Sequence, residues 1–348
     1  MTNATAEITP NPPRRLHLRW ATFAALLLLA APLHAQTCQT SAELDDATRA
    51  AITAAAQRYF DMAAKADAAS LKQNAIPTLA ADFSAIEATV KDHQQDLAGA
   101  QTTAKPFLLE AEGTAPLPDA EFYCGVFGKN GQTSGSAVFR LDNLPPGKYA
   151  VVLLTATTAT SRTNFSLVLQ QNVLQQSATD WKLAGLYLQP AQIAGHDGDW
   201  FITRARDYKT KGQLHNAWFY YLEARTLISP VPFMSTLATD KLYDESQSLQ
   251  PTDLPANGKL VDLAAGTTTY KLTAIFPAAV ANDVDLIVKY QAADVSNTTQ
   301  TNQNNVAVIK ALAARYPEIK DAFAGVVARA VDPSGRDFGT LLAMKDIK

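Results

Sequence analysis

Residues 197–230 read DGDWFITRARDYKTKGQLHNAWFYYLEARTLISP, and this is the most informative stretch of the chain. Small residues and tyrosines recur in it at helical intervals, at Ala205, Tyr208, Gly212, Ala217, Tyr221 and Ala224. The small alanines would let two antiparallel helices approach closely, and the tyrosines would fill the space between them. Gly212 and Gln213 supply a turn, Trp200 opens the first helix and Pro230 closes the second. The stretch therefore predicts a helical hairpin.

The same spacing resembles one tetratricopeptide (TPR) repeat, a two-helix unit of about 34 residues. It departs from that family in being solitary, because stable arrays need at least about three repeats. The resemblance therefore implies a hairpin docked on a neighbouring domain, with residues 234–249 adding a capping helix. We assign residues 193–250 to this unit and expect it to bind a protein partner.

Four consecutive aromatic residues lie in the second helix of this unit, and four consecutive positions point all around a helix. One face must therefore meet another domain or a partner. The rings could all be core between domains, or one face could stay open as a protein-binding surface. The candidate partner-binding residues of the second alternative are Trp200, Trp218, Phe219 and Tyr220.

Upstream, helical patterns come first and strand patterns follow. Residues 41–69 predict a long helix with Ser41 as its N-cap, and residues 78–97 predict a second helix. Strand patterns then cover 107–111, 121–127, 137–141, 149–155, 165–169 and 181–188. Because short turns join these strands, they should form an antiparallel sheet. The predicted class is α+β, with helices packed on a curved antiparallel sheet.

This order of elements over residues 42–190, ending in DWKLAGLY at 180–187, resembles the NTF2-like (cystatin-like cone) superfamily. The LPPGKY core within 139–151 is similar instead to a hairpin of secreted β-sandwich domains, but the preceding helices favour the first resemblance. We assign residues 36–192 to this domain. Ketosteroid isomerase-like members carry acidic and phenolic groups inside the cone. By that analogy Tyr59, Tyr123 or Asp142 could face a cavity and serve an isomerase-like enzyme.

The rest of the chain predicts a small ββαβ domain at residues 260–348, after a linker with two prolines and a glycine near 251–259. Strands are expected at 270–276, 285–291 and 338–344. A helical pattern covers 306–313, and Pro317 begins or kinks a further helix that carries Val326 and Val327.

Residues 1–35 resemble a secretory signal, with three arginines, an apolar run over 20–33 and Ala35 before a cleavage site. The run is too short to span a membrane, which needs about 20 apolar residues. We therefore expect an exported protein, periplasmic or extracellular, with no membrane span after cleavage; an uncleaved anchor is the alternative. Cys38 and Cys124 would then be a candidate disulfide, with two free thiols or a lipid-anchored Cys38 as alternatives.

The chemistry-bearing residues point to no familiar active site. A formal net charge of −3 argues against nucleic acid as a partner, and the sequence has no G-x-S-x-G, S-x-x-K or glycine-rich phosphate loop. The loop at 195–199 combines His196 with Asp197 and Asp199, which could hold a metal, or one aspartate could cap the helix that begins near Trp200. We favour the cap and expect neither metal nor cofactor. The expected function is a non-catalytic binding or scaffolding module of the cell envelope.

Overall fold

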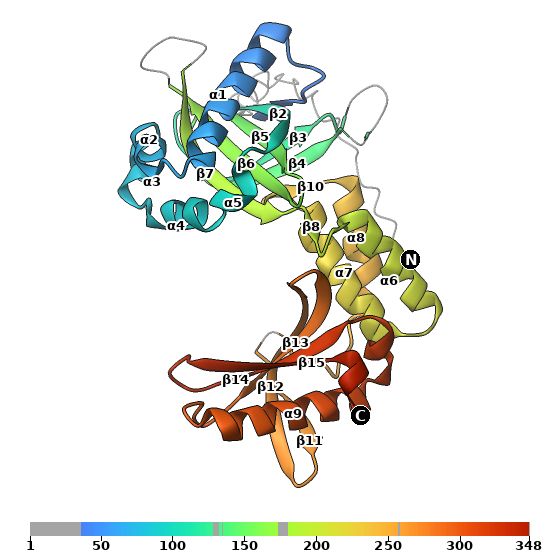
Figure 1. Ribbon diagram of the computed structural model, residues 1–348. Coiled ribbons are helices and arrows are strands. Elements are labelled where there is room, and N and C mark those ends of the chain that lie inside the picture. Colours follow the sequence, from blue (N-terminus) through green and yellow to red (C-terminus); the bar gives the residue numbers. More distant parts are fainter. Residues whose placement is uncertain (1–35, 128–131, 134, 173–179, 257, 348) are drawn as a thin grey trace, which may run out of the picture. The chain divides into compact units, whose positions relative to one another are not determined.

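The computed structural model describes residues 36–127, 132–133, 135–172, 180–256 and 258–347, and Figure 1 shows the helices and strands that they form. The signal segment predicted at residues 1–35 lies outside the described residues. The described chain is a mixture of helices and mainly antiparallel strands, in agreement with the predicted class.

Short helices follow one long helix near the start of the chain. They are α1 (Asp46–Ala64), α2 (Ala68–Gln73), α3 (Pro77–Ala81), α4 (Ser84–Asp92) and α5 (Gln94–Leu97). The N-cap of α1 is Asp45, whose carboxylate accepts a hydrogen bond of 2.8 Å from the Thr48 amide, so the predicted cap at Ser41 is wrong. The predicted helix over 41–69 also ends early, because Ala66 takes a positive φ of 52° and Asp67 caps α2. The predicted helix over 78–97 is divided into α3, α4 and α5.

A five-stranded antiparallel sheet follows, in the order β1 (Gln36–Gln39), β2 (Gln101–Ala111), β5 (Gly147–Thr157), β6 (Arg162–Gln171) and β7 (Trp181–Pro190). The helices α1 to α5 cover one face, where the rings of Phe60 and Phe165 meet edge to face at 5.2 Å. The other face packs against a three-stranded sheet, in the order β10 (Met234–Ser235), β4 (Ala137–Leu144) and β3 (Leu117–Cys124). Phe107 of the large sheet and Phe139 of the small one meet at 5.0 Å. Both faces of the large sheet are therefore buried.

The next segment is a short two-stranded ribbon and three helices. They are β8 (Gln192–Ile193), β9 (His196–Asp197), α6 (Gly198–Thr210), α7 (Leu214–Ile228) and α8 (Leu237–Gln247). Gly212 has a φ of +74° in the turn between α6 and α7, a conformation that glycine adopts without steric cost. The alanines and tyrosines that set the sequence spacing are buried where α6 packs on α7.

The last part of the chain is a second five-stranded sheet, in the order β11 (Val261–Ala265), β12 (Thr268–Val280), β13 (Asp283–Gln291), β14 (Gly325–Val331) and β15 (Asp337–Ala343). The helix α9 (Thr298–Arg315) and the 3-10 turn η2 (Pro317–Asp321) connect β13 to β14, which run parallel; the 3-10 turn η3 (Met344–Asp346) follows β15. The predicted ββαβ order therefore lacks β11 and β14. Val326 and Val327 lie in β14 and not in a helix, because η2 is only one short turn. Within the predicted linker, Leu254 is buried, at 5% exposed.

Within the described ranges, no helix combines the length and the apolar character that crossing a membrane requires.

Candidate functional site

The four aromatic candidates of the helical unit do not share one surface. Phe219 and Tyr220 are buried, with exposed fractions of 1% and 3%, and both rings pack near Phe323, which follows η2. These two residues are therefore core, which was the other alternative that the sequence left open. Trp218 is half-buried against the same core. Trp200 is also half-buried, and it lines a pocket at the surface.

The indole of Trp200 is held by aromatic neighbours. Phe201 meets it edge to face at 4.9 Å, and Tyr220 lies 5.8 Å away. The imidazole of His196 stacks on it, with ring centroids 3.7 Å apart and planes within 9° of parallel. The guanidinium of Arg204 lies 5.9 Å from the indole centroid. The core therefore fixes the indole, and the indole in turn orients the imidazole.

A tight ribbon places His196 beside Trp200. Ile193 pairs with His196, and the two residues between them, Ala194 and Gly195, have positive φ angles of 49° and 78°. Such angles at both central positions are those of a type I′ turn, which suits the twist of a two-residue hairpin. Alanine at a positive φ costs of order 1 kcal/mol, so the fold maintains this turn against a local preference.

The turn between β5 and β6 forms the other side of the pocket. It is attached to the ribbon by backbone, because the Ala191 amide donates to the Arg162 carbonyl at 2.8 Å. The Arg162 guanidinium also lies 3.8 Å from the Asp197 carboxylate. The pocket holds about 600 Å³, and its lining is Thr157, Thr158, Ala159, Thr160, Ser161, Arg162, Gln192, Gly195, His196, Asp197 and Trp200.

The contacts of Asp197 show that it acts as a helix cap. Its carboxylate accepts a 3.0 Å hydrogen bond from the Trp200 amide, which confirms the predicted N-cap. In the part of the chain that the structure describes, no three His, Cys, Asp or Glu side chains gather in a metal-holding arrangement. The pocket therefore offers a guanidinium, an imidazole, an indole, hydroxyls, an amide and the carboxylate of Asp197, one oxygen of which caps α6.

Glycine at position 198 is required where α6 begins under the pocket. A Cβ atom there would lie 2.4 Å from Cγ2 of Ile228 on α7, far inside van der Waals contact. The absent side chain lets the start of α6 lie against the end of α7, and this contact sets the position of Trp200.

A second polar cluster lies at the opposite end of α7. His215 Nδ1 lies 2.7 Å from Glu318 Oε1, and its Nε2 lies 3.0 Å from Asp253 Oδ1. Burial raises and the His215 contact lowers the pKa of Asp253, and the net effect is a lowered pKa. Nearby, the hydroxyls of Tyr208 and Tyr220 donate to the carbonyls of Asp321 and Ala322. These contacts attach α6 and α7 to the segment at η2.

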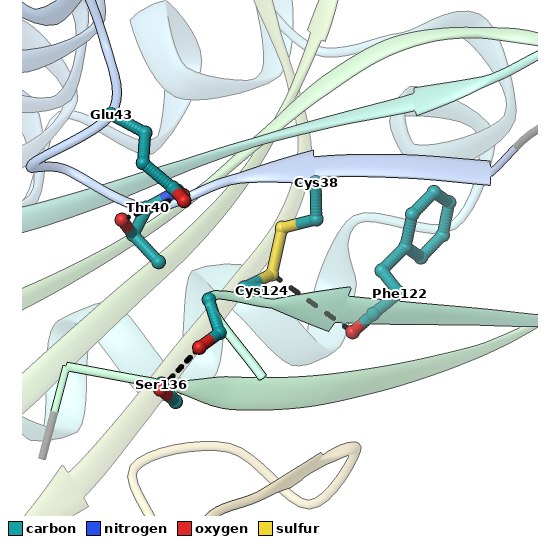
Figure 2. The surroundings of a disulfide bond; sticks show 7 residues. Cys38, Thr40, Glu43, Phe122, Cys124 and Ser136 are labelled. Carbon is teal, nitrogen blue, oxygen red and sulfur yellow. Dashed lines mark hydrogen bonds between the residues drawn. A yellow bond between two sulfur atoms is a disulfide. The ribbon is translucent and has the colours of Figure 1, made fainter. Parts of the chain in front are cut away.

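The two cysteines are joined as a disulfide between β1 and the end of β3, with a Cα–Cα distance of 4.9 Å (Figure 2). Beside it, the Ser136 hydroxyl donates to the Gly125 carbonyl at 2.9 Å. The bond connects an edge strand of the large sheet to an edge strand of the small one. It is a structural link between the two layers.

The residues named for an isomerase-like site do not converge. Tyr59 is fully buried, and its hydroxyl donates to the carbonyls of Asn74 and Trp181 at 3.0 and 2.8 Å. Tyr123 and Asp142 have exposed side chains on the small sheet. Tyr59 therefore lies in the core, whereas the side chains of Tyr123 and Asp142 lie at the surface.

No protein-family model, no curated protein and no solved structure matches this chain.

Proposed function

We propose that this chain is an exported, non-catalytic binding protein whose ligand site is the pocket lined by Arg162, His196 and Trp200. The observation that carries the proposal is the stacked imidazole–indole pair on the wall of that pocket. Core contacts hold the pair in place before any ligand arrives, and such preorganisation reduces the entropy cost of binding.

The lining suits a hydroxylated ring that bears a carboxylate, such as a sugar acid. A flat aromatic wall packs against the C–H face of such a ring, and a guanidinium binds a carboxylate through two parallel hydrogen bonds. Arg162 is available for this role, because its side chain is 46% exposed and its contact with Asp197 is long, at 3.8 Å. The side-chain amide of Gln192 and the hydroxyls of the β5–β6 turn supply further polar contacts.

Export is supported by the disulfide as well as by the N-terminal pattern. A disulfide persists in oxidising compartments and is rare in the cytosol. The binding role continues the expectation from the sequence, with the ligand surface moved from the buried rings Phe219 and Tyr220 to the pocket beside Trp200.

The test is calorimetric titration of the purified protein with glucuronate and galacturonate oligomers, with neutral oligomers of the same length as the comparison. We expect tighter binding of the acidic sugars, and we expect R162Q to abolish that preference. H196A should weaken both kinds of sugar at least tenfold. R140Q is the matched control, because Arg140 is an exposed arginine paired with Asp119 on the small sheet. The proposal is wrong if no sugar binds, or if R162Q and R140Q bind alike.

A further inference from the structure

A second pocket adjoins the one at Trp200, and we call it the adjoining pocket. It holds about 590 Å³, and its walls come from the large sheet, the helices that cover that sheet, the β8–β9 ribbon and the turn between β12 and β13. The residues that line it without lining the pocket at Trp200 are His93, Asp96, Thr163, Pro190, Ala194, Ala279, Ala281 and Asn282.

The β5–β6 turn and the β8–β9 ribbon form the boundary between the two pockets. Five residues line both pockets, namely Thr160, Ser161, Arg162, Gln192 and Gly195. The side-chain amide of Gln192 donates to the Thr160 carbonyl at 3.2 Å, which holds the turn against the ribbon. Beside Gly195 the space is open, because a Cβ atom there would meet no atom within 4 Å apart from its chain neighbours. The boundary therefore leaves room for a ligand that extends from one pocket into the other.

Strand pairing and core packing hold the walls of the adjoining pocket in place. Thr163 and Pro190 are register partners of β6 and β7. Ala281 and Asn282 form the two-residue turn between β12 and β13. The short helix α5 is anchored by Leu97, which is buried in the core that the helices share with the large sheet. The walls therefore exist before a ligand arrives, which reduces the entropy cost of binding.

The polar groups of the adjoining pocket suit a neutral, hydroxylated ligand. His93 Nδ1 lies 3.0 Å from Asp96 Oδ2, and the two side chains are 35% and 42% exposed, so a ligand can reach both. Together with the side-chain amide of Asn282 they offer hydrogen-bond donors and acceptors side by side, which is what the hydroxyls of a sugar need. The Asp96 carboxylate would repel a second carboxylate placed here. The adjoining pocket therefore favours a neutral sugar over an acidic one.

Arg162 relates the two pockets, because it lines both. If its guanidinium binds the carboxylate of a sugar acid whose ring packs on Trp200, that carboxylate lies at the boundary. In a hexuronic acid the carboxylate is attached to C5, which is bonded to C4 and is separated from C1 only by the ring oxygen. A sugar unit linked through C1 or C4 therefore begins next to the carboxylate, and the adjoining pocket is the space that it would enter.

We propose that the adjoining pocket is a subsite for a neutral sugar unit, so that the ligand is a chain in which a uronate is linked through C1 or C4 to a neutral hexose. The uronate lies on Trp200 with its carboxylate on Arg162. The hydroxyls of the neutral unit meet His93, Asp96 and Asn282. This inference rests on the proposed function, because the uronate must occupy the pocket at Trp200 for the next unit to reach the subsite.

The test is calorimetric titration of the purified protein with three probes: methyl glucuronide, glucuronate linked through its C1 to O4 of glucose, and the same disaccharide with a second glucuronate in place of the glucose. We expect the mixed disaccharide to bind at least tenfold more tightly than methyl glucuronide and more tightly than the diacid. A279W should remove the tenfold gain, because the exposed Ala279 lines only the adjoining pocket; T273W is its control, at an exposed position of the same strand outside both pockets. D96N should narrow the preference for the mixed disaccharide over the diacid, and D92N is its control, because Asp92 is exposed and lines neither pocket.

The outcomes separate this proposal from the one on which it rests. If none of the three probes binds, the proposed function is wrong and the subsite with it. If methyl glucuronide binds as tightly as the mixed disaccharide, or if A279W and T273W have equal effects, the adjoining pocket is not a subsite and the proposed function still stands. Equal binding of the diacid and the mixed disaccharide, or equal preferences in D96N and D92N, would overturn the assignment of a neutral unit. D96N preserves the size of the side chain, so it keeps the test open should A279W fail to fold.

Discussion

Glu223 offers a quantitative test of the packing of α7. It lies on the same helix face as two buried residues, Phe219 four positions before it and Leu227 four positions after it. Its carboxylate has no hydrogen bond or ion pair in the described part of the chain. Burial raises its pKa from 4.5 to about 7.

The raised pKa of Glu223 determines how the stability of the chain changes with pH. A pKa that is higher in the folded chain means that the ionised carboxylate destabilises the fold. The free energy of unfolding should therefore fall as the pH rises from about 4.5 to about 7, and level off above that. At about 1.4 kcal/mol for each pKa unit, the whole difference is worth at most about 3.5 kcal/mol. Because the side chain keeps some contact with water, we expect about 1–3 kcal/mol.

The assay is urea unfolding of the wild-type chain and E223Q between pH 4 and pH 8, followed by tryptophan fluorescence. We expect equal stability near pH 4 and a more stable E223Q at pH 8. When the assay is extended down to pH 2, the difference in stability between the wild-type chain and E245Q should show the opposite pH dependence. Hydrogen bonds from Arg206 and Tyr221 lower the pKa of Glu245 to about 2, so its stabilisation is present above pH 4.5 and is lost as the pH falls toward 2. If E223Q raises the free energy of unfolding by the same amount at every pH, ionisation of the buried Glu223 carboxylate is not what destabilises the wild-type chain.

Three further changes test the contacts that build the molecule. G198A places a Cβ atom 2.4 Å from Ile228 and should lower the free energy of unfolding by about 1–3 kcal/mol. In thermal unfolding the double variant G198A/I228A should recover most of this loss, and a double variant without such recovery would contradict the clash. Replacing Cys38 and Cys124 by serine removes a cross-link between residues 86 positions apart, and in the chain-entropy model this should lower the free energy of unfolding by about 4–5 kcal/mol. Urea unfolding measures the loss, and the wild-type protein with its disulfide reduced should be as unstable as the serine variant. H215A removes the imidazole that Asp253 and Glu318 share, and it should lower the free energy of unfolding by about 1–3 kcal/mol at pH 6. An unchanged urea midpoint would show that His215 does not help to attach α7 to η2.

The parts of the fold that local spacing determines were predictable from the sequence. The alternation of small and aromatic residues identified α6 and α7, and the N-cap at Asp197 followed from its position before Trp200. The strand patterns also located β2 to β7, although each observed strand is longer than or offset from its pattern by a few residues. In each case the signal lies within about fifteen residues of chain.

Other elements were predicted wrongly or incompletely because their local sequence pattern was ambiguous. The run Gly325-Val-Val-Ala-Arg-Ala-Val331 suits a buried strand as well as a helix, and only its pairing with β13 distinguishes the two. The first turns of α9 are rich in threonine and asparagine, which have low helix propensity, and tertiary packing on the sheet overrides that preference. The N-cap of α1 was misplaced because Ser41 and Asp45 are equally good caps in sequence.

The candidate site could be predicted only in part, because its residues come from segments that are far apart in the sequence. His196 and Trp200 lie four residues apart and stood out in the sequence, whereas Arg162 lies 34 positions before His196 and belongs to a different turn. No local sequence pattern joins the two segments, which are brought together by tertiary contacts such as the hydrogen bond from the Ala191 amide to the Arg162 carbonyl and the contact between Arg162 and Asp197.

The aromatic run at 218–221 shows why composition alone did not locate a binding surface. Four consecutive aromatic residues point all around α7, so a single covering element cannot bury them all. Around the aromatic run the chain supplies further cover, because Phe323 and the 316–322 segment reach Phe219 and Tyr220 and accept a hydroxyl bond from the latter. Phe219 and Tyr220 are therefore used for packing within the chain, and the number of aromatic residues in a helix was a poor guide to a partner surface.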